Sequence, residues 1–144
     1  MQFKKLGKSD LEVSSYCLGT MTFGEATSEK DGHEQIDISI DAGINFFDTA
    51  EMYPTCPLKA ETTGDTETIF GNWIDNNRSK RSEIVLATKI SGIGYNAVRN
   101  GEGINGRSIK IAIEGSLERL KTDYVDLYQF CLLYTSPSPR DVRS

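Results

Sequence analysis

The sequence predicts an α/β fold, because short apolar segments alternate with segments of helical periodicity. The apolar segments are centred near residues 17, 46, 86 and 126, and a helical pattern follows each of the first three. Successive β-α-β units have right-handed crossovers and place their strands parallel in one sheet. Either a doubly wound sheet or part of a barrel is compatible with this pattern.

The strands are predicted from runs of apolar and β-branched residues that are bounded by glycine or polar residues. Two shorter segments, Gln2–Lys5 and Leu11–Val13, flank a polar turn and predict a small β-hairpin that caps a larger structure. We expect the first strand of the sheet to be buried and to end where glycine lets a ligand approach the backbone closely. The four strands of the sheet are predicted at Tyr16–Thr20, Ile44–Phe47, Glu83–Ile90 and Val125–Phe130.

The helices are predicted from capping residues and from the spacing of apolar side chains. The first lies between Ser28, which begins an acidic capping box, and the helix terminator Gly43. The second begins near Asp65 or Thr66, either of which can cap it. The third, from about Arg107 to Lys121, carries an apolar stripe along one face.

Length and charge exclude several classes of function. A chain of 144 residues is long enough for one ordinary domain with a hydrophobic core. Its net charge of −5, from 21 acidic and 16 basic residues, disfavours nucleic-acid binding, which needs a basic surface. No apolar run has the length of a membrane span, and the first residues lack the apolar core of a signal peptide. We therefore expect a cytoplasmic protein without membrane partners.

The cysteines and the histidine do not predict a disulfide framework or a metal site. Cys17, Cys56 and Cys131 are odd in number and widely spaced, which is typical of reduced thiols. The single histidine, His33, falls within a predicted helix, where a surface or core role is expected. No metal-binding residue is therefore predicted.

A glycine-rich loop is predicted at Ser91–Gly106. Within it, Gly92–Ala97 has the form of a dinucleotide-binding fingerprint. A true fingerprint opens directly into a helix, so a Rossmann-type domain predicts a helix that starts after Ala97. Further glycine and asparagine residues follow instead, and we interpret the segment as a flexible loop.

Three titratable residues lie at or just beyond the predicted carboxyl ends of strands: Asp48, Tyr53 and Lys89. In both candidate architectures this end of the sheet carries the active site. A phenol is a weak acid at neutral pH, but a nearby ammonium stabilises its ionised form and makes it a better proton donor. A carboxylate paired with the lysine would hold it charged and in place. Such a trio suits protonation of a carbonyl oxygen while a nicotinamide supplies a hydride to the carbon.

Each of these residues also has a simpler interpretation when it is considered alone. Asp48 could cap the turn that follows it, Tyr53 could pack against its neighbours, and Lys89 could be a solvated strand end. The wider sequence decides between the two interpretations. The segments Gly43–Tyr53, Ala87–Lys89 and Leu117–Gln129 resemble the aldo-keto reductase superfamily, and within it the bacterial Tas-like reductases.

The resemblance extends from Met1 to about Gln129 and implies both a fold and an activity. The implied fold is an eight-stranded (β/α)8 TIM barrel, of which residues 1–130 form the amino-terminal half. The implied activity is NADPH-dependent reduction of aldehydes or ketones to alcohols, with NADP(H) bound without a Rossmann domain. A non-catalytic NADPH-binding regulatory subunit, such as the potassium-channel β subunits of the same superfamily, is the alternative.

The resemblance also implies roles for individual residues. Tyr53 would be the general acid, Lys89 would tune its acidity, and Asp48 would hold Lys89. The nicotinamide would be bordered by Gly19, Thr20, Met21 and Asp48.

The sequence departs from the family pattern at Cys131. Family members carry a catalytic histidine at this position, and a thiol is too weak a hydrogen-bond donor to replace an imidazole. From Cys131 to Ser144 the sequence resembles a translated sequencing adapter, so a non-native or disordered tail is expected there. The absent half of the barrel would carry most contacts to the cofactor's adenosine and phosphate groups. We therefore expect the chain as given to lack useful turnover.

Overall fold

The computed structural model describes residues 1–131; the predicted tail, apart from Cys131, lies outside the described residues. Within this range, four parallel strands form one sheet in the order β3-β4-β5-β6. The strands are β3 (Cys17–Gly19), β4 (Phe46–Asp48), β5 (Val85–Ile90) and β6 (Leu127–Phe130). Their spatial order equals their order in the chain, whereas the strand order of a doubly wound sheet reverses. The sheet is therefore one wall of a barrel, as predicted.

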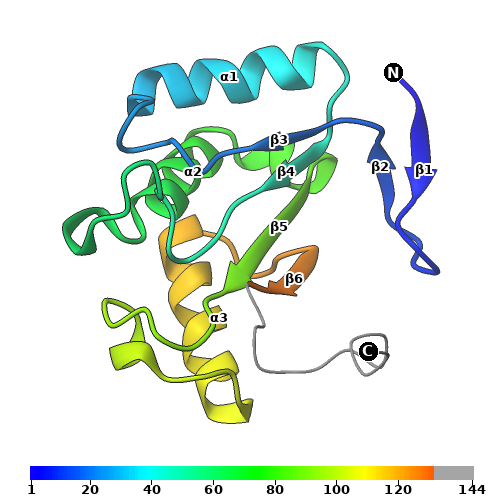
Figure 1. Ribbon diagram of the computed structural model, residues 1–144. Coiled ribbons are helices and arrows are strands. Elements are labelled where there is room, and N and C mark those ends of the chain that lie inside the picture. The colour runs from blue at the N-terminus through cyan, green and yellow to red at the C-terminus, as the bar shows by residue number, and fades with distance from the viewer. Residues whose placement is uncertain (132–144) are drawn as a thin grey trace, which may run out of the picture.

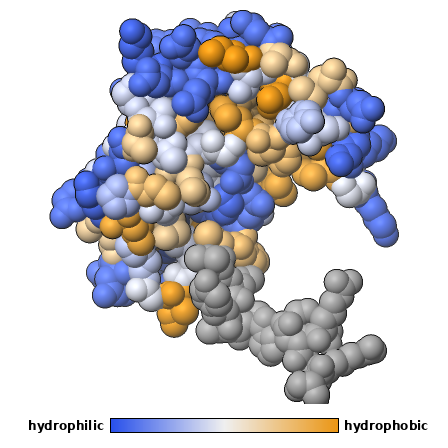
Figure 2. Space-filling model, turned by 45° about the horizontal axis from the view of Figure 1, so that its top comes forward, coloured by the Kyte–Doolittle hydropathy of each residue, from blue (hydrophilic) through white to orange (hydrophobic). Residues whose placement is uncertain are grey.

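Three α-helices connect the strands and lie together on one side of the sheet (Figure 1). They are α1 (Glu29–Asp41), α2 (Asp65–Asn76) and α3 (Gly106–Leu120). Short 3-10 helices occur at η1 (Ala60–Thr62), η2 (Arg78–Glu83) and η3 (Arg99–Gly101). Because α1 faces outward, mostly hydrophilic side chains cover it at the top of the molecule in Figure 2. None of the helices within residues 1–131 is both long and apolar enough to cross a membrane.

The helix ends follow the predicted capping rules with one exception. The Ser28 hydroxyl oxygen accepts a hydrogen bond of 3.1 Å from the Asp31 amide and caps α1, as the capping box predicts. The cap of α2 is Gly64, with a φ of 93°, rather than Asp65 or Thr66. The Thr66 hydroxyl donates instead to the carbonyl oxygen of Phe23, which lies far away in the sequence, so it is not available for capping.

A β-hairpin of β1 (Phe3–Lys5) and β2 (Glu12–Ser14) lies at the amino-terminal end of the sheet (Figure 1). Asn45, the residue before β4, joins the two parts. Its side-chain oxygen accepts from the Ser14 amide at 2.8 Å, and its amide nitrogen donates to the Glu12 carbonyl oxygen at 2.9 Å. The hairpin therefore caps the end of the sheet that is opposite to the predicted site.

The core lies between the sheet and the helices. Phe47 and Leu86 from the sheet are completely buried with Phe70 and Leu120 from the helices, and Trp73 is 1% exposed. The rings of Phe47 and Phe70 meet edge to face with centroids 5.6 Å apart. This packing closes the helical side of the sheet.

The prediction of a buried first strand is wrong for this structure. Cys17 and Gly19 of β3 are exposed, and the preceding Tyr16 is 69% exposed. Within residues 1–131, β3 pairs only with β4 and forms one edge of the sheet, and Phe130 on the opposite edge strand is 51% exposed. The apolar pattern indicates a strand covered on both faces, whereas residues 1–131 cover only the helical face.

Candidate active site

The ends of two adjacent strands bring a carboxylate and an ammonium into contact. Asp48 is the last residue of β4, and Lys89 lies one residue before the end of β5. The Lys89 ammonium donates to Asp48 Oδ2 at 2.6 Å and to the Thr49 carbonyl oxygen at 2.9 Å. The Lys89 side chain is only 14% exposed, so both contacts act in a largely desolvated setting.

The tyrosine reaches the same ammonium from the loop that follows β4. The Tyr53 hydroxyl oxygen accepts a hydrogen bond of 3.0 Å from Lys89 Nζ, which lies 4.6 Å from the centre of the tyrosine ring. The Tyr53 amide donates to the Ala50 carbonyl oxygen at 3.2 Å, and this turn brings the side chain back to the sheet. Because the lysine is the donor, the hydroxyl proton of Tyr53 is free to point toward another acceptor.

The surroundings keep Lys89 positively charged. Burial lowers the pKa of Lys89, but the hydrogen bonds to Asp48 and Tyr53 and the charge attraction of both groups together outweigh it, so the pKa lies above the ordinary value. A cation in hydrogen-bond contact with a phenol oxygen stabilises negative charge on that oxygen. The three residues that the sequence singles out therefore form one connected group in the structure.

A fourth member of this group, Gln129, was not singled out from the sequence. Its side-chain amide on β6 donates to Asp48 Oδ1 at 2.9 Å, on the opposite side of the carboxylate from Lys89. Its position in the sheet could have indicated this contact, since Gln129 is the register partner of Lys89 on the neighbouring strand. Both carboxylate oxygens of Asp48 are therefore occupied by donors.

The residues predicted to border a nicotinamide lie beside Asp48 and differ in their accessibility. A methyl group added at Gly19 would meet no atom within 4 Å, and Met21 is 44% exposed. Thr20 is completely buried, and its amide and hydroxyl both donate to the Asp48 carbonyl oxygen, at 3.1 and 2.9 Å. Gly19 and Met21 are thus open to solvent beside Asp48, while Thr20 holds the end of β4.

Cys131 lies close to Lys89 and Asp48 of the same group. Its amide donates to the Ile90 carbonyl oxygen at 2.8 Å, which continues the pairing of β6 with β5. Burial raises the pKa of the Cys131 thiol, and the opposing effect of Lys89 is smaller. The thiol is therefore neutral near pH 7 and provides only a weak hydrogen-bond donor.

The glycine-rich loop does not form a dinucleotide cradle. No α-helix starts after Ala97, and the next one, α3, begins only at Gly106 behind the cap residue Asn105. The Rossmann-type hypothesis is therefore wrong. Among residues 1–131, no group of three or more His, Cys, Asp and Glu side chains is arranged to hold a metal ion.

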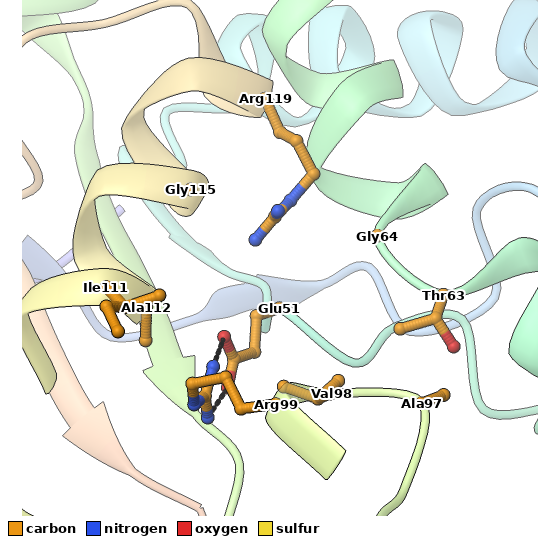
Figure 3. Close-up of a pocket in the computed structure, with 10 residues that line it drawn as sticks. All are labelled: Glu51, Thr63, Gly64, Ala97, Val98, Arg99, Ile111, Ala112, Gly115 and Arg119. Carbon is orange, nitrogen blue, oxygen red and sulfur yellow. Dashed lines mark hydrogen bonds and ion pairs between the residues drawn. The ribbon is translucent and has the colours of Figure 1, made fainter. Parts of the chain in front are cut away.

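A cavity of about 280 Å³ lies next to the group but does not include Asp48, Tyr53 or Lys89. Figure 3 shows Glu51 and Arg99 paired on one side of this cavity and the Arg119 side chain pointing into it. The cavity is lined by Glu51, Thr63, Gly64, Ala97, Val98, Arg99, Ile111, Ala112, Gly115 and Arg119.

Known protein sequences are similar to this chain over most of its length. The sequence model of the Aldo/keto reductase family matches residues 16–135. Protein tas of Escherichia coli strain K12 is 46% identical over 132 residues, which cover 90% of this chain and 38% of that protein. A probable voltage-gated potassium channel subunit beta from Oryza sativa subsp. japonica is 36% identical, over 88% of this chain and 36% of its own length.

A solved structure is similar to this chain in both fold and sequence. The aldo-keto reductase AKR11C1 from Bacillus halodurans, in its holo form, superimposes with a TM-score of 0.72 and 34% sequence identity. The superposition covers 90% of this chain and 40% of that structure. The chain therefore spans about two fifths of the length of the proteins that it matches.

Proposed function

Because the chain belongs to the aldo/keto reductase family, we propose that it carries the proton-donating part of an NADPH-dependent reductase. The substrates in this proposal are aldehydes or ketones, and the products are alcohols. The observation that supports it best is the position of the Lys89 ammonium, which contacts the Asp48 carboxylate at 2.6 Å and the Tyr53 hydroxyl at 3.0 Å.

Each of the three side chains has one task in this proposal. A nicotinamide, when bound, would supply the hydride that adds to the carbonyl carbon of the substrate. Tyr53 donates its hydroxyl proton to the carbonyl oxygen, and the charge of Lys89 stabilises the phenolate that remains. Asp48 keeps Lys89 charged and oriented, and Gln129 fixes the other side of the carboxylate.

The proposed cofactor site uses the open side of the strand ends. Gly19 and Met21 would border the nicotinamide together with Asp48, and Thr20 would support them because it holds the Asp48 backbone. A preference for NADPH over NADH and a reducing cytoplasmic location belong to the same proposal.

The chain as given lacks a histidine next to this group, and we propose that residues 131–144 are not native to it. The thiol of Cys131 cannot orient a substrate carbonyl as an imidazole does. We therefore expect no useful turnover from the 144-residue chain. Steady NADPH oxidation by that chain in the presence of 4-nitrobenzaldehyde would refute this expectation.

A chimaera tests the proposed activity directly. Residues 1–130 of this chain would be joined to the remainder of the Escherichia coli protein tas, at the position where the two sequences correspond. The proposal predicts NADPH-dependent reduction of 4-nitrobenzaldehyde by the chimaera. Lys89→Met in the same chimaera should lower the rate about 100-fold or more, because the phenolate loses its stabilising charge. Equal rates for the two proteins would contradict the proposal.

A second candidate function is supported by the similarity to the rice channel subunit. In this alternative the protein binds NADPH as a regulatory subunit and does not turn over substrate. The chimaera would then bind NADPH, detected by quenching of cofactor fluorescence, without consuming it in the presence of any aldehyde tested. Turnover that depends on Lys89 excludes this alternative.

A further inference from the structure

The corner between Asp48 and Tyr53 continues the pairing of β4 with β5 beyond the end of β4. The Thr49 amide donates to the Ala87 carbonyl oxygen at 2.9 Å, and the Glu51 amide donates to the Lys89 carbonyl oxygen at 3.2 Å. These bonds attach the corner to the strand that carries Lys89. The position of Tyr53 relative to Lys89 therefore depends on how firmly this short segment is held.

The Glu51 side chain makes the next hydrogen bond along the same pair of segments. Its Oε1 accepts a hydrogen bond of 2.6 Å from the Ser91 amide, directly after β5. The Arg99 guanidinium binds both carboxylate oxygens, at 2.6 and 2.7 Å, in a bidentate pair (Figure 3). The side chains of Glu51 and Arg99 are only 3% and 11% exposed.

The backbone at Arg99 is held in a conformation that a side chain disfavours. Arg99 and the following Asn100 have φ values of 45° and 52°, in the left-handed region that is uncommon for residues other than glycine. Such strain persists where surrounding contacts select it, and it is common near functional sites. The contact that holds the Arg99 side chain against the corner is its pairing with the Glu51 carboxylate.

Net stability is a poor explanation for this pair. Desolvation of two charges offsets most of their attraction, so a buried ion pair often contributes little to folding. A bidentate pair between an arginine and a carboxylate, however, forms only within a narrow range of distances and angles. It can therefore hold a loop in one position. On the far side, the Tyr53 carbonyl oxygen accepts from the Gly64 amide at 3.1 Å, so the corner is held at both ends.

We infer that Glu51 and Arg99 are positioning residues, which hold the corner so that the Tyr53 hydroxyl stays in contact with the Lys89 ammonium. Neither touches the group that donates the proton. Glu51 acts through Met52, the one residue that separates it from Tyr53, and Arg99 acts through Glu51. The inference rests on the proposed function, because it concerns the geometry of the proposed proton donor.

The test uses the 144-residue chain and needs no turnover. The pKa of Lys89 is measured by NMR of its side-chain nuclei in chain labelled at lysine, and the signal is assigned by its loss in Lys89→Arg. The variants are Glu51→Gln and Arg99→Gln, with Tyr53→Phe as the reference for loss of the contact. The matched control is Glu102→Gln. Glu102 lies in the same loop as Arg99, and its Oε1 is 3.9 Å from Arg107 Nη1.

The two variants separate positioning from direct electrostatics. Removal of the Glu51 charge lowers the pKa of Lys89 by either route. Removal of the Arg99 charge raises the pKa if the charge acts directly and lowers it if the Tyr53 contact is lost. We expect both variants to lower the pKa toward the value in Tyr53→Phe, and Glu102→Gln to leave it unchanged.

A double variant completes the test. In a Tyr53→Phe background, Arg99→Gln should cause no further fall, since the contact that it disturbs is already absent. If Glu51→Gln does not fold, as judged by circular dichroism, Arg99→Gln and the milder Arg99→Lys decide the question, with a smaller fall expected for the lysine variant.

Three results would overturn the inference. A rise of the Lys89 pKa in Arg99→Gln, or no change in either variant, would contradict positioning and leave the proposed function intact. A Lys89 pKa at or below its ordinary value in the wild-type chain would contradict both, because the three-residue group itself would be absent.

Discussion

The two oxygens of the Asp48 carboxylate serve two different donors, which makes Asp48→Asn an informative change. Lys89 donates to Oδ2 at 2.6 Å, and Gln129 donates to Oδ1 at 2.9 Å. An asparagine side chain has one oxygen acceptor, and its other end is itself a donor. In either orientation of the amide, one of the two donors faces an NH2 group and loses its partner.

The expected cost follows from the burial of the pair. A hydrogen bond to a charged group contributes about 1.5–3 kcal/mol, and breaking a fully buried ion pair costs about 3–5 kcal/mol. The side chains of Lys89 and Asp48 are 14% and 28% exposed, so solvent compensates part of the loss. We expect the free energy of unfolding to fall by about 2 kcal/mol.

Urea unfolding followed by circular dichroism measures this change, with the m value as a check that the same surface is exposed. The matched control is Asp75→Asn. Asp75 pairs with Arg78 at the same 2.6 Å, but on the surface, with side chains 49% and 58% exposed. We expect the unfolding midpoint of this control to stay unchanged. A fall for Asp48→Asn no larger than for Asp75→Asn would refute the reasoning that burial makes the Asp48 pair important.

Two further predictions concern packing and pH. Gly71→Ala should destabilise the chain by about 3 kcal/mol in the same urea assay, because the added methyl group overlaps the Arg119 backbone oxygen where α2 meets α3; Gly106→Ala, with open space around it, is the control. The pKa of Lys89 is raised by folding above its ordinary value of 10.5, so its stabilising contribution is fully present below about pH 10.5. The difference in unfolding free energy between wild type and Lys89→Met should therefore be constant from about pH 7 to 10 and shrink at higher pH, and a difference that grows there would contradict the assignment.

The order of strands and helices is predictable from the sequence because each depends on local signals. Ser28 and Gly43 bracket α1 as capping chemistry predicts, and the apolar runs locate the strands of the sheet. Asp48 and Lys89 follow from the rule that polar residues at the carboxyl ends of parallel strands gather at one edge of a sheet.

The remaining features depend on contacts between distant residues. Gln129 reaches Asp48 across 81 residues of sequence, and Arg99 reaches Glu51 across 48. No local pattern indicates such partners. The exposure of β3 was unpredictable for a different reason, since its apolar residues match an environment with cover on both faces.

In the proposed function, Tyr53 donates a proton to a carbonyl oxygen in a nicotinamide-dependent reduction. The most direct measurement is the single-turnover rate of NADPH oxidation by the chimaera with 4-nitrobenzaldehyde, compared between wild type and Tyr53→Phe. We predict that Tyr53→Phe slows this step by about 100-fold to 10,000-fold while the dissociation constant for NADPH stays the same. An unchanged rate in Tyr53→Phe would contradict the role assigned to Tyr53.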